Sequence, residues 1–161
     1  MSKYGLKAII SPHDANQINS VNGCDAYCDK YGDQTTFYST AEAKSDYDDR
    51  LSAILHYQSP NFGKSWANLD EAIWAFDLQN EPFSSSTVFD QFDYNDPNDW
   101  LCGRAGVLRD TLGLCTGIAV ATGGIGGSEI CCDREWNLLP KALYCDAIDV
   151  MSVHEYMSKS S

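Results

Sequence analysis

Three short stretches of the 161-residue sequence combine side chains that could transfer protons or bind polar ligands. In chain order they contain His13, the pair Asn80 and Glu81, and the pair His154 and Tyr156. Each stretch directly follows a short apolar run of the kind that forms a buried strand. The carboxyl ends of parallel strands lie at one edge of a sheet, so these side chains are expected to converge there. The sequence therefore predicts one site built from three distant segments.

Glu81 is the strongest candidate for chemistry in this set. A carboxyl group at the edge of a buried strand is shielded from water, which favours its protonated form. A protonated carboxyl group can act as a general acid, as the cleavage of a glycosidic bond requires. Pro82 fixes the turn directly after Glu81, and Asn80 supplies an amide that could hold a sugar hydroxyl. A surface glutamate after a strand is the plainer alternative.

The strands that must position these residues are indicated by four apolar runs. The runs show no alternation with polar residues, which predicts strands buried on both faces of a parallel sheet. Helical patterns lie between them, and strands that alternate with helices imply right-handed βαβ crossovers. The fold class is therefore predicted to be α/β. The predicted strands are Leu6–Ser11, Ile73–Gln79, Gly117–Thr122 and Ala147–Val153.

Three helices are expected between these strands. The first begins at a capping box formed by Ser39 and Glu42. It should end by Ser59, because Pro60 disfavours helical geometry in the residue before it. The other two are expected over Asn98–Leu112 and Glu135–Tyr144, and the segments 11–36 and 82–97 are expected to be long polar loops.

Composition limits the classes of partner. The 11 basic and 23 acidic residues give a formal net charge of −12. Nucleic acids are disfavoured as partners, because phosphate binding needs clustered Lys and Arg, and anionic membrane surfaces are disfavoured for the same reason. No apolar run reaches the ~20 residues of a membrane-spanning helix. A single domain is expected, with no obligate protein partner.

Seven cysteines are many for a chain of this length. An oxidising compartment explains them best, with some of them paired as disulfides. Because the count is odd, one cysteine is free or pairs outside the chain, and the connectivity stays open. The Cys and His spacings fit no zinc site, and no metal or other cofactor is expected. The first residues lack the apolar core of a signal peptide, so we expect the natural start of a secreted protein to be missing.

The three stretches together resemble glycoside hydrolase family 5, the cellulase and mannanase family. The run 75–82, Ala-Phe-Asp-Leu-Gln-Asn-Glu-Pro, is similar to the end of that family's fourth strand. Lys7–Asn16 resembles its third strand, and Val153–Tyr156 resembles its sixth. The resemblance implies a partial (β/α)8 barrel of about four parallel βα units, covering strands three to six. Residues 1–161 would then be a single catalytic domain, incomplete at both ends.

The resemblance also implies a role for each residue of the predicted site. Glu81 becomes the acid/base of a retaining mechanism, with Asn80 near the sugar 2-hydroxyl. His13 would line the sugar cleft, and His154 and Tyr156 would orient the nucleophile and the substrate. The family's nucleophile is a Glu that ends strand seven, which this sequence does not contain. The chain alone is therefore expected to be inactive.

The expected function is hydrolysis of a β-linked polysaccharide by an extracellular endo-β-1,4-glucanase or endo-β-1,4-mannanase. The alternative is a non-catalytic carbohydrate-binding protein, or an inactive truncated barrel, that keeps the site without the nucleophile. Another clan of barrel hydrolases is a third interpretation. Within the chain, Asp14, Glu129 and Glu155 are formal candidates for the nucleophile, and each is better explained as a loop, helix-start or outward-facing residue.

Overall fold

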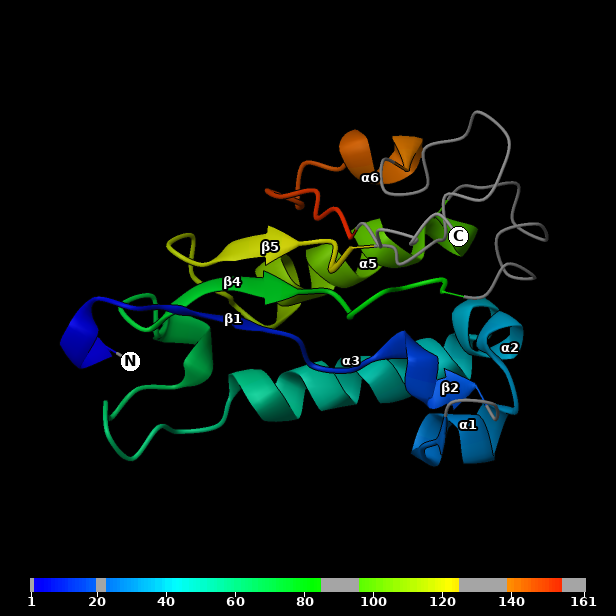
Figure 1. Ribbon diagram of the computed structural model, residues 1–161, viewed down its shortest axis with the longest axis horizontal. Coiled ribbons are helices and arrows are strands. Elements are labelled where there is room, and N and C mark those ends of the chain that lie inside the picture. The colour runs from blue at the N-terminus through cyan, green and yellow to red at the C-terminus, as the bar shows by residue number, and fades with distance from the viewer. Residues whose placement is uncertain (1, 20–22, 85–95, 125–138, 155–161) are drawn as a thin grey trace, which may run out of the picture.

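The computed structural model describes residues 2–19, 23–84, 96–124 and 139–154, which fold as a mixed α/β protein around a small parallel sheet (Figure 1). Three strands form this sheet in the order β1-β4-β5, and all of them run in the same direction. Each strand lies within an apolar run that predicted one, so the expectation of parallel α/β architecture is confirmed. The strands are β1 (Ala8–Ile10), β4 (Ile73–Asp77) and β5 (Ala119–Ala121).

The fourth predicted strand, Ala147–Val153, is present as a single parallel bridge between Val150 and Ala121. A side chain interrupts the ladder at this place. The carboxylate of Asp149 accepts the Val120 N–H at 2.7 Å, where a neighbouring strand would offer a backbone carbonyl. The same carboxylate pairs with Arg109. Three of the four predicted strands are therefore formed, and the fourth is reduced to a single bridge.

The longest helix, α3 (Ala41–Leu55), matches the helix predicted ahead of Pro60. Its predicted start was wrong by one residue. Thr40 is the N-cap, and its hydroxyl accepts the Ala43 N–H at 3.4 Å. Ser39 instead ends a preceding helix, α2 (Gln34–Ser39), so the expected capping box does not form.

The other two predicted helices are found with different bounds. Helix α5 (Trp100–Gly106) continues into one π-helical segment, η5 (Val107–Thr111), and together they fill most of the second predicted range. Helix α6 (Pro140–Leu143) begins at Pro140, where the missing amide hydrogen is of no consequence because first-turn amides have no partner inside a helix. Residues 135–138 of the third predicted helix lie outside the described residues.

The predicted loop 11–36 contains regular structure, so that prediction was wrong. Three aspartates, at positions 14, 25 and 33, each cap the start of a short helix through the side-chain oxygens. The elements in and around this segment are η2 (Ala15–Gln17), β2 (Ile18–Asn19), β3 (Gly23–Cys24) and α1 (Ala26–Tyr31), and the remaining 3-10 turns are η1 (Ser2–Tyr4), η3 (Trp66–Asn68) and η4 (Pro97–Asp99).

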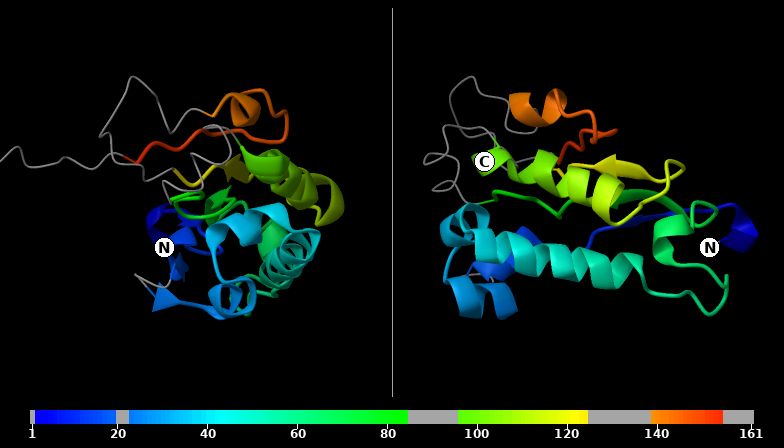
Figure 2. Two further views of the ribbon diagram at one scale, coloured as in Figure 1. Left: turned by 90° about the vertical axis from the view of Figure 1, so that its right-hand side faces the viewer. Right: turned by 180° about the vertical axis from the view of Figure 1, so that it is seen from behind.

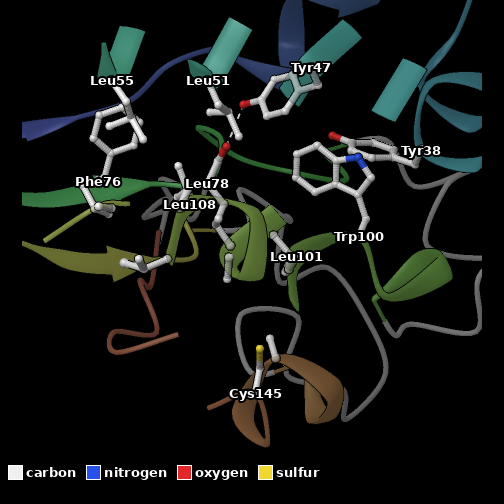
Figure 3. Packing of buried hydrophobic residues seen from close by; sticks show 14 of the residues in the cluster. Tyr38, Tyr47, Leu51, Leu55, Phe76, Leu78, Trp100, Leu101, Leu108 and Cys145 are labelled. Atoms are coloured by element: carbon white, nitrogen blue, oxygen red, sulfur yellow. Dashed lines mark hydrogen bonds between the residues drawn. The ribbon is translucent and has the colours of Figure 1, made fainter. Parts of the chain in front are cut away.

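Helices α3 and α5 lie on the same side of the parallel sheet (Figure 2). Their apolar faces meet the inward side chains of β4 and β5 in one hydrophobic core (Figure 3). On the strands themselves, Ile9 and Trp74 remain 55% and 49% exposed. One face of the sheet is thus covered by helices, and the other is partly open among the described residues. Fully buried members of the core include Phe37, Tyr38, Tyr47, Leu51, Phe76, Leu78 and Trp100.

Two disulfides confirm that some of the cysteines are paired. Cys24 bonds to Cys28 across the start of α1, and Cys102 on α5 bonds to Cys145 beyond α6. Cys115 forms no disulfide with any described residue, and the remaining two cysteines, 131 and 132, lie outside the described residues. No helix in the described part of the chain is long and apolar enough to cross a membrane.

Candidate functional site

The segments that follow β1 and β4 stay bonded to each other beyond the ends of the strands. The Asn80 N–H donates to the His13 carbonyl at 2.8 Å, and the Asn80 carbonyl accepts from the Ala15 N–H at 3.0 Å. On the other side, the Glu81 N–H donates to the Gly123 carbonyl at 3.1 Å. The backbone of Asn80 and Glu81 is therefore held from both neighbouring segments, and Glu81 lies at the carboxyl edge of the sheet.

Two glycines after β5 allow its following segment to lie close to Gln79 and His154. Gly123 has a φ of +91°, and a Cβ atom on it would lie 1.6 Å from the backbone oxygen of Gln79. A Cβ atom on Gly124 would lie 2.2 Å from Cδ2 of His154. Both positions need glycine, because any side chain would displace the strand end or the histidine. Residues 125–127, which continue this glycine-rich run, lie outside the described residues.

Glu81 is 8% exposed, and its carboxyl group is contacted on both oxygens. Its Oε1 lies 3.1 Å from Nδ1 of His154, and its Oε2 accepts a hydrogen bond from Nδ2 of Asn16 at 2.8 Å. The structure thus brings together two of the predicted residues, Glu81 and His154, from segments 73 positions apart. A buried carboxyl group held on both oxygens has a fixed orientation, as proton transfer requires.

Asn16 was missing from the predicted site. It reaches Glu81 because Asp14 caps the short turn η2, with Oδ1 accepting from both the backbone N–H and the side-chain amide of Asn16, each at 3.0 Å. One side-chain amide therefore joins two carboxyl groups. The available signal was the Asp-x-Asn spacing directly after the first strand, which is typical of a side-chain-capped turn.

His13 faces the protein interior, which differs from the expectation that it lines a sugar cleft. It is 7% exposed, with Nε2 lying 2.6 Å from Oδ2 of Asp25 and Nδ1 lying 2.8 Å from Nε2 of Gln79. Both ring nitrogens are engaged, so neither is left to bind a sugar hydroxyl. Burial lowers the pKa of His13, against the opposing effect of Asp25.

Asn80 and Tyr156 complete the predicted set. Asn80 is half-buried, and its side-chain amide makes no hydrogen bond with any described residue. That amide is available to a ligand at the edge next to Glu81. Tyr156 lies outside the described residues, as do Glu129 and Glu155, two of the three formal nucleophile candidates.

The carboxyl group of Asp77, the last residue of β4, also lies near the carboxyl edge of the sheet. Burial raises the pKa of Asp77, while the hydrogen bond from Ser11 and the nearby His154 act in the opposite direction. The Ser11 hydroxyl donates to Oδ2 of Asp77 at 3.0 Å. Asp77 ends β4 and Glu81 follows in the next turn, so both carboxyl groups lie near this edge of the sheet.

Among the described residues, no three or more His, Cys, Asp or Glu side chains are grouped as metal ligands. Comparison of the chain with protein-family models, with curated proteins and with solved structures gave no match. Function is therefore inferred from the fold and from the geometry of the site.

Proposed function

We propose that this chain is part of the catalytic domain of a retaining β-glycanase similar to glycoside hydrolase family 5, with Glu81 as the acid/base. In this proposal the parallel strands belong to a (β/α)8 barrel, whose ligands bind at the carboxyl edge. The observation that carries the proposal is the position of Glu81, which is 8% exposed at that edge and has its carboxyl group held between Asn16 and His154.

The two contacts give the carboxyl oxygens different roles. Oε2 accepts from Asn16, so a proton on Glu81 resides on Oε1, the oxygen that faces His154. In the first step that proton passes to the glycosidic oxygen as its bond to the anomeric carbon breaks and a second carboxylate attaches to that carbon. In the second step Glu81 takes a proton from the water that displaces the carboxylate. The resemblance places the second carboxylate on a strand that this sequence does not contain.

The neighbouring residues support substrate binding. The side-chain amide of Asn80, which has no hydrogen-bond partner among the described residues, is suited to a sugar hydroxyl beside the cleaved bond. His154 orients Glu81, and Tyr156 keeps the substrate-binding role that the resemblance implies. The expected substrate is a β-1,4-linked glucan or mannan. The two disulfides are compatible with secretion into an oxidising compartment.

The decisive experiment uses the protein translated from the complete reading frame, with Glu81→Gln as the variant. Glutamine cannot donate a proton, so the rate on an unactivated polysaccharide should fall by about 10²- to 10⁴-fold. A dinitrophenyl glycoside has a leaving group that needs no protonation, so its first step should be affected far less. Equal loss on both substrates, or near-normal activity on the polysaccharide, would remove Glu81 from the acid/base role.

A non-catalytic carbohydrate-binding protein is the second candidate. The observation that favours it is the position of Asp14, the carboxyl group that shares the Asn16 amide with Glu81. Its Oδ1 is already occupied in capping η2, which disfavours it as a nucleophile. Calorimetric titration of this chain with cellohexaose and mannohexaose, together with an assay for new reducing ends, distinguishes the candidates. Binding without cleavage by the complete protein would favour the second.

A further inference from the structure

We infer that Tyr38 is a positioning residue for Glu81, acting through a buried hydrogen-bond relay that also contains Gln79, His13 and Asp25. The relay fixes the turn that follows β4 and carries Glu81. Its existence is a property of the fold alone, whereas its effect on rate rests on the proposed function.

The turn after β4 has a backbone that needs external support. Glu81 and Phe83, on either side of Pro82, have φ values of +47° and +60°. Residues other than glycine rarely adopt this left-handed conformation, and it persists where surrounding contacts fix it. The contact at the far end of the turn is a hydrogen bond of 3.1 Å from the Phe83 N–H to the Tyr38 hydroxyl.

This one backbone donor sets the direction of every other bond in the relay. An amide N–H can only donate, so the Tyr38 oxygen accepts and its hydrogen must go elsewhere. It goes to Oε1 of Gln79, at 2.6 Å. The carbonyl oxygen of Gln79 is thereby placed toward Tyr38, and its NH2 group faces Nδ1 of His13 at 2.8 Å.

The same donor and acceptor assignments determine which ring nitrogen of His13 carries the hydrogen. Nδ1 accepts from Gln79, so the ring hydrogen is on Nε2, which donates to Oδ2 of Asp25 at 2.6 Å. Asp25 is itself fixed, because its Oδ1 accepts the N–H groups of Tyr27 and Cys28 at the start of α1. The relay therefore runs from a strained backbone amide to a carboxylate anchored on a helix, through a neutral histidine.

Water has little access to the middle of this relay. Tyr38 and Gln79 are both 0% exposed. The Tyr38 ring packs against Phe83 and Trp100, with centroids 4.5 and 5.1 Å away (Figure 3 shows Tyr38 beside Trp100). Loss of the Tyr38 hydroxyl would remove one hydrogen bond from the Phe83 N–H and one from the side-chain carbonyl of Gln79. Both groups are buried, where the loss of a hydrogen-bond partner is unfavourable.

The relay reaches Glu81 through the backbone. Residues 81–83 form one short turn, fixed at its start by the Glu81 N–H to Gly123 bond and at its end by the Phe83 N–H to Tyr38 bond. If the second bond is lost, the left-handed Phe83 can relax, and the Glu81 carboxyl group moves relative to Asn16 and His154. A displacement of ~1 Å at a catalytic group can lower a rate by 10²-fold.

The test compares Tyr38→Phe with the matched control Tyr47→Phe. Tyr47 is also 0% exposed, and its hydroxyl donates to the Leu78 carbonyl at 2.6 Å (dashed in Figure 3), so each variant loses one buried hydroxyl. In the protein from the complete reading frame, Tyr38→Phe should speed hydrogen exchange of the Phe83 amide by at least ~10-fold. It should lower kcat by at least ~10-fold, with KM changed by less than about twofold. Tyr47→Phe should leave both quantities near the wild-type values.

Three results would separate the inference from the proposed function. Equal Phe83 exchange in the two variants overturns the relay. Faster exchange with unchanged kcat keeps the relay and overturns its positioning role. If the wild-type protein cleaves no glycan, the proposed function fails, and the positioning role fails with it. The relay itself is then decided by exchange and by ¹⁵N NMR of His13, where hydrogen on Nδ1 instead of Nε2 overturns it.

Discussion

The side-chain amide of Asn16 donates to Oε2 of Glu81 at 2.8 Å and to Oδ1 of Asp14 at 3.0 Å. One uncharged group thus lies between two carboxyl groups, and both hydrogens of its NH2 group are used. An amide can supply two donors without adding charge, whereas a lysine in this place would stabilise both carboxylates strongly. Asn16 can therefore fix the direction of the Glu81 carboxyl group without placing a charge beside it.

Asn16→Asp should change the pH dependence of the proposed reaction. The aspartate adds a negative charge between two carboxyl groups, so proton loss from the site becomes less favourable. We expect the alkaline limb of kcat/KM to move upward by about 1 pH unit or more. Asn16→Ala, which removes the donor without adding charge, is the control. Identical pH profiles for the two variants would mean that Asn16 exerts no electrostatic effect on Glu81.

Gln79→Glu should change the protonation state of His13. A carboxylate has no hydrogen to give to Nδ1, and it places negative charge 2.8 Å from that nitrogen. With Asp25 already on Nε2, the imidazole would be held between two carboxylates and should become doubly protonated at neutral pH. The ¹⁵N chemical shifts of the ring report this directly. A neutral His13 in the variant at pH 7 would contradict the donor order of the relay.

The contribution of His13 to stability should fall as the pH drops below about 6.5, because burial lowers the pKa of His13 from its ordinary value of 6.5. In this range the unfolded chain binds a proton at this position while the folded chain does not, which favours unfolding. Asp25 and Asp14 oppose the shift, and Arg50 adds to it. Burial raises the pKa of Asp96 to about 6, which favours folding at low pH. The loss due to His13 is therefore measured by urea unfolding between pH 7.5 and 5 as the difference between the wild type and His13→Gln.

His13→Gln should remove this loss from the pH dependence of the unfolding free energy. An NMR titration in which the His13 ring gains its second proton near pH 6.5 in the folded protein would contradict the prediction.

The sequence predicted those features that are set by residues close together in the chain. The apolar run 73–79 fixes β4, and Tyr47, Leu51 and Leu55 mark the buried face of α3 at helical spacing. The approach of Glu81 to His154 was expected from parallel strands, and it is found although the segment before His154 forms only one bridge. These features need no knowledge of distant partners.

The remaining features depend on partners that a local pattern does not reveal. His13 turns inward because Gln79 and Asp25 bond its two nitrogens, and those residues lie 66 and 12 positions away. Asp149 limits the fourth strand to a bridge because its carboxylate reaches Val120. Such outcomes are set by tertiary hydrogen bonds, which override the local hydrophobic pattern.

The two disulfides should contribute differently to stability. Cys102 and Cys145 are 43 positions apart, and Cys24 and Cys28 are 4 apart. By loop-closure entropy the first should stabilise the fold by about 4 kcal/mol and the second by about 2 kcal/mol.

The shorter disulfide, however, encloses Asp25, which ends the relay. Paired Cys→Ser variants should therefore separate the effects, measured by urea unfolding and by Phe83 amide exchange. Removal of Cys102–Cys145 should lower the free energy of unfolding more. Removal of Cys24–Cys28 should increase the rate of hydrogen exchange of the Phe83 amide more. The reverse order in the exchange measurement would show that Asp25 is held by α1 without help from the disulfide.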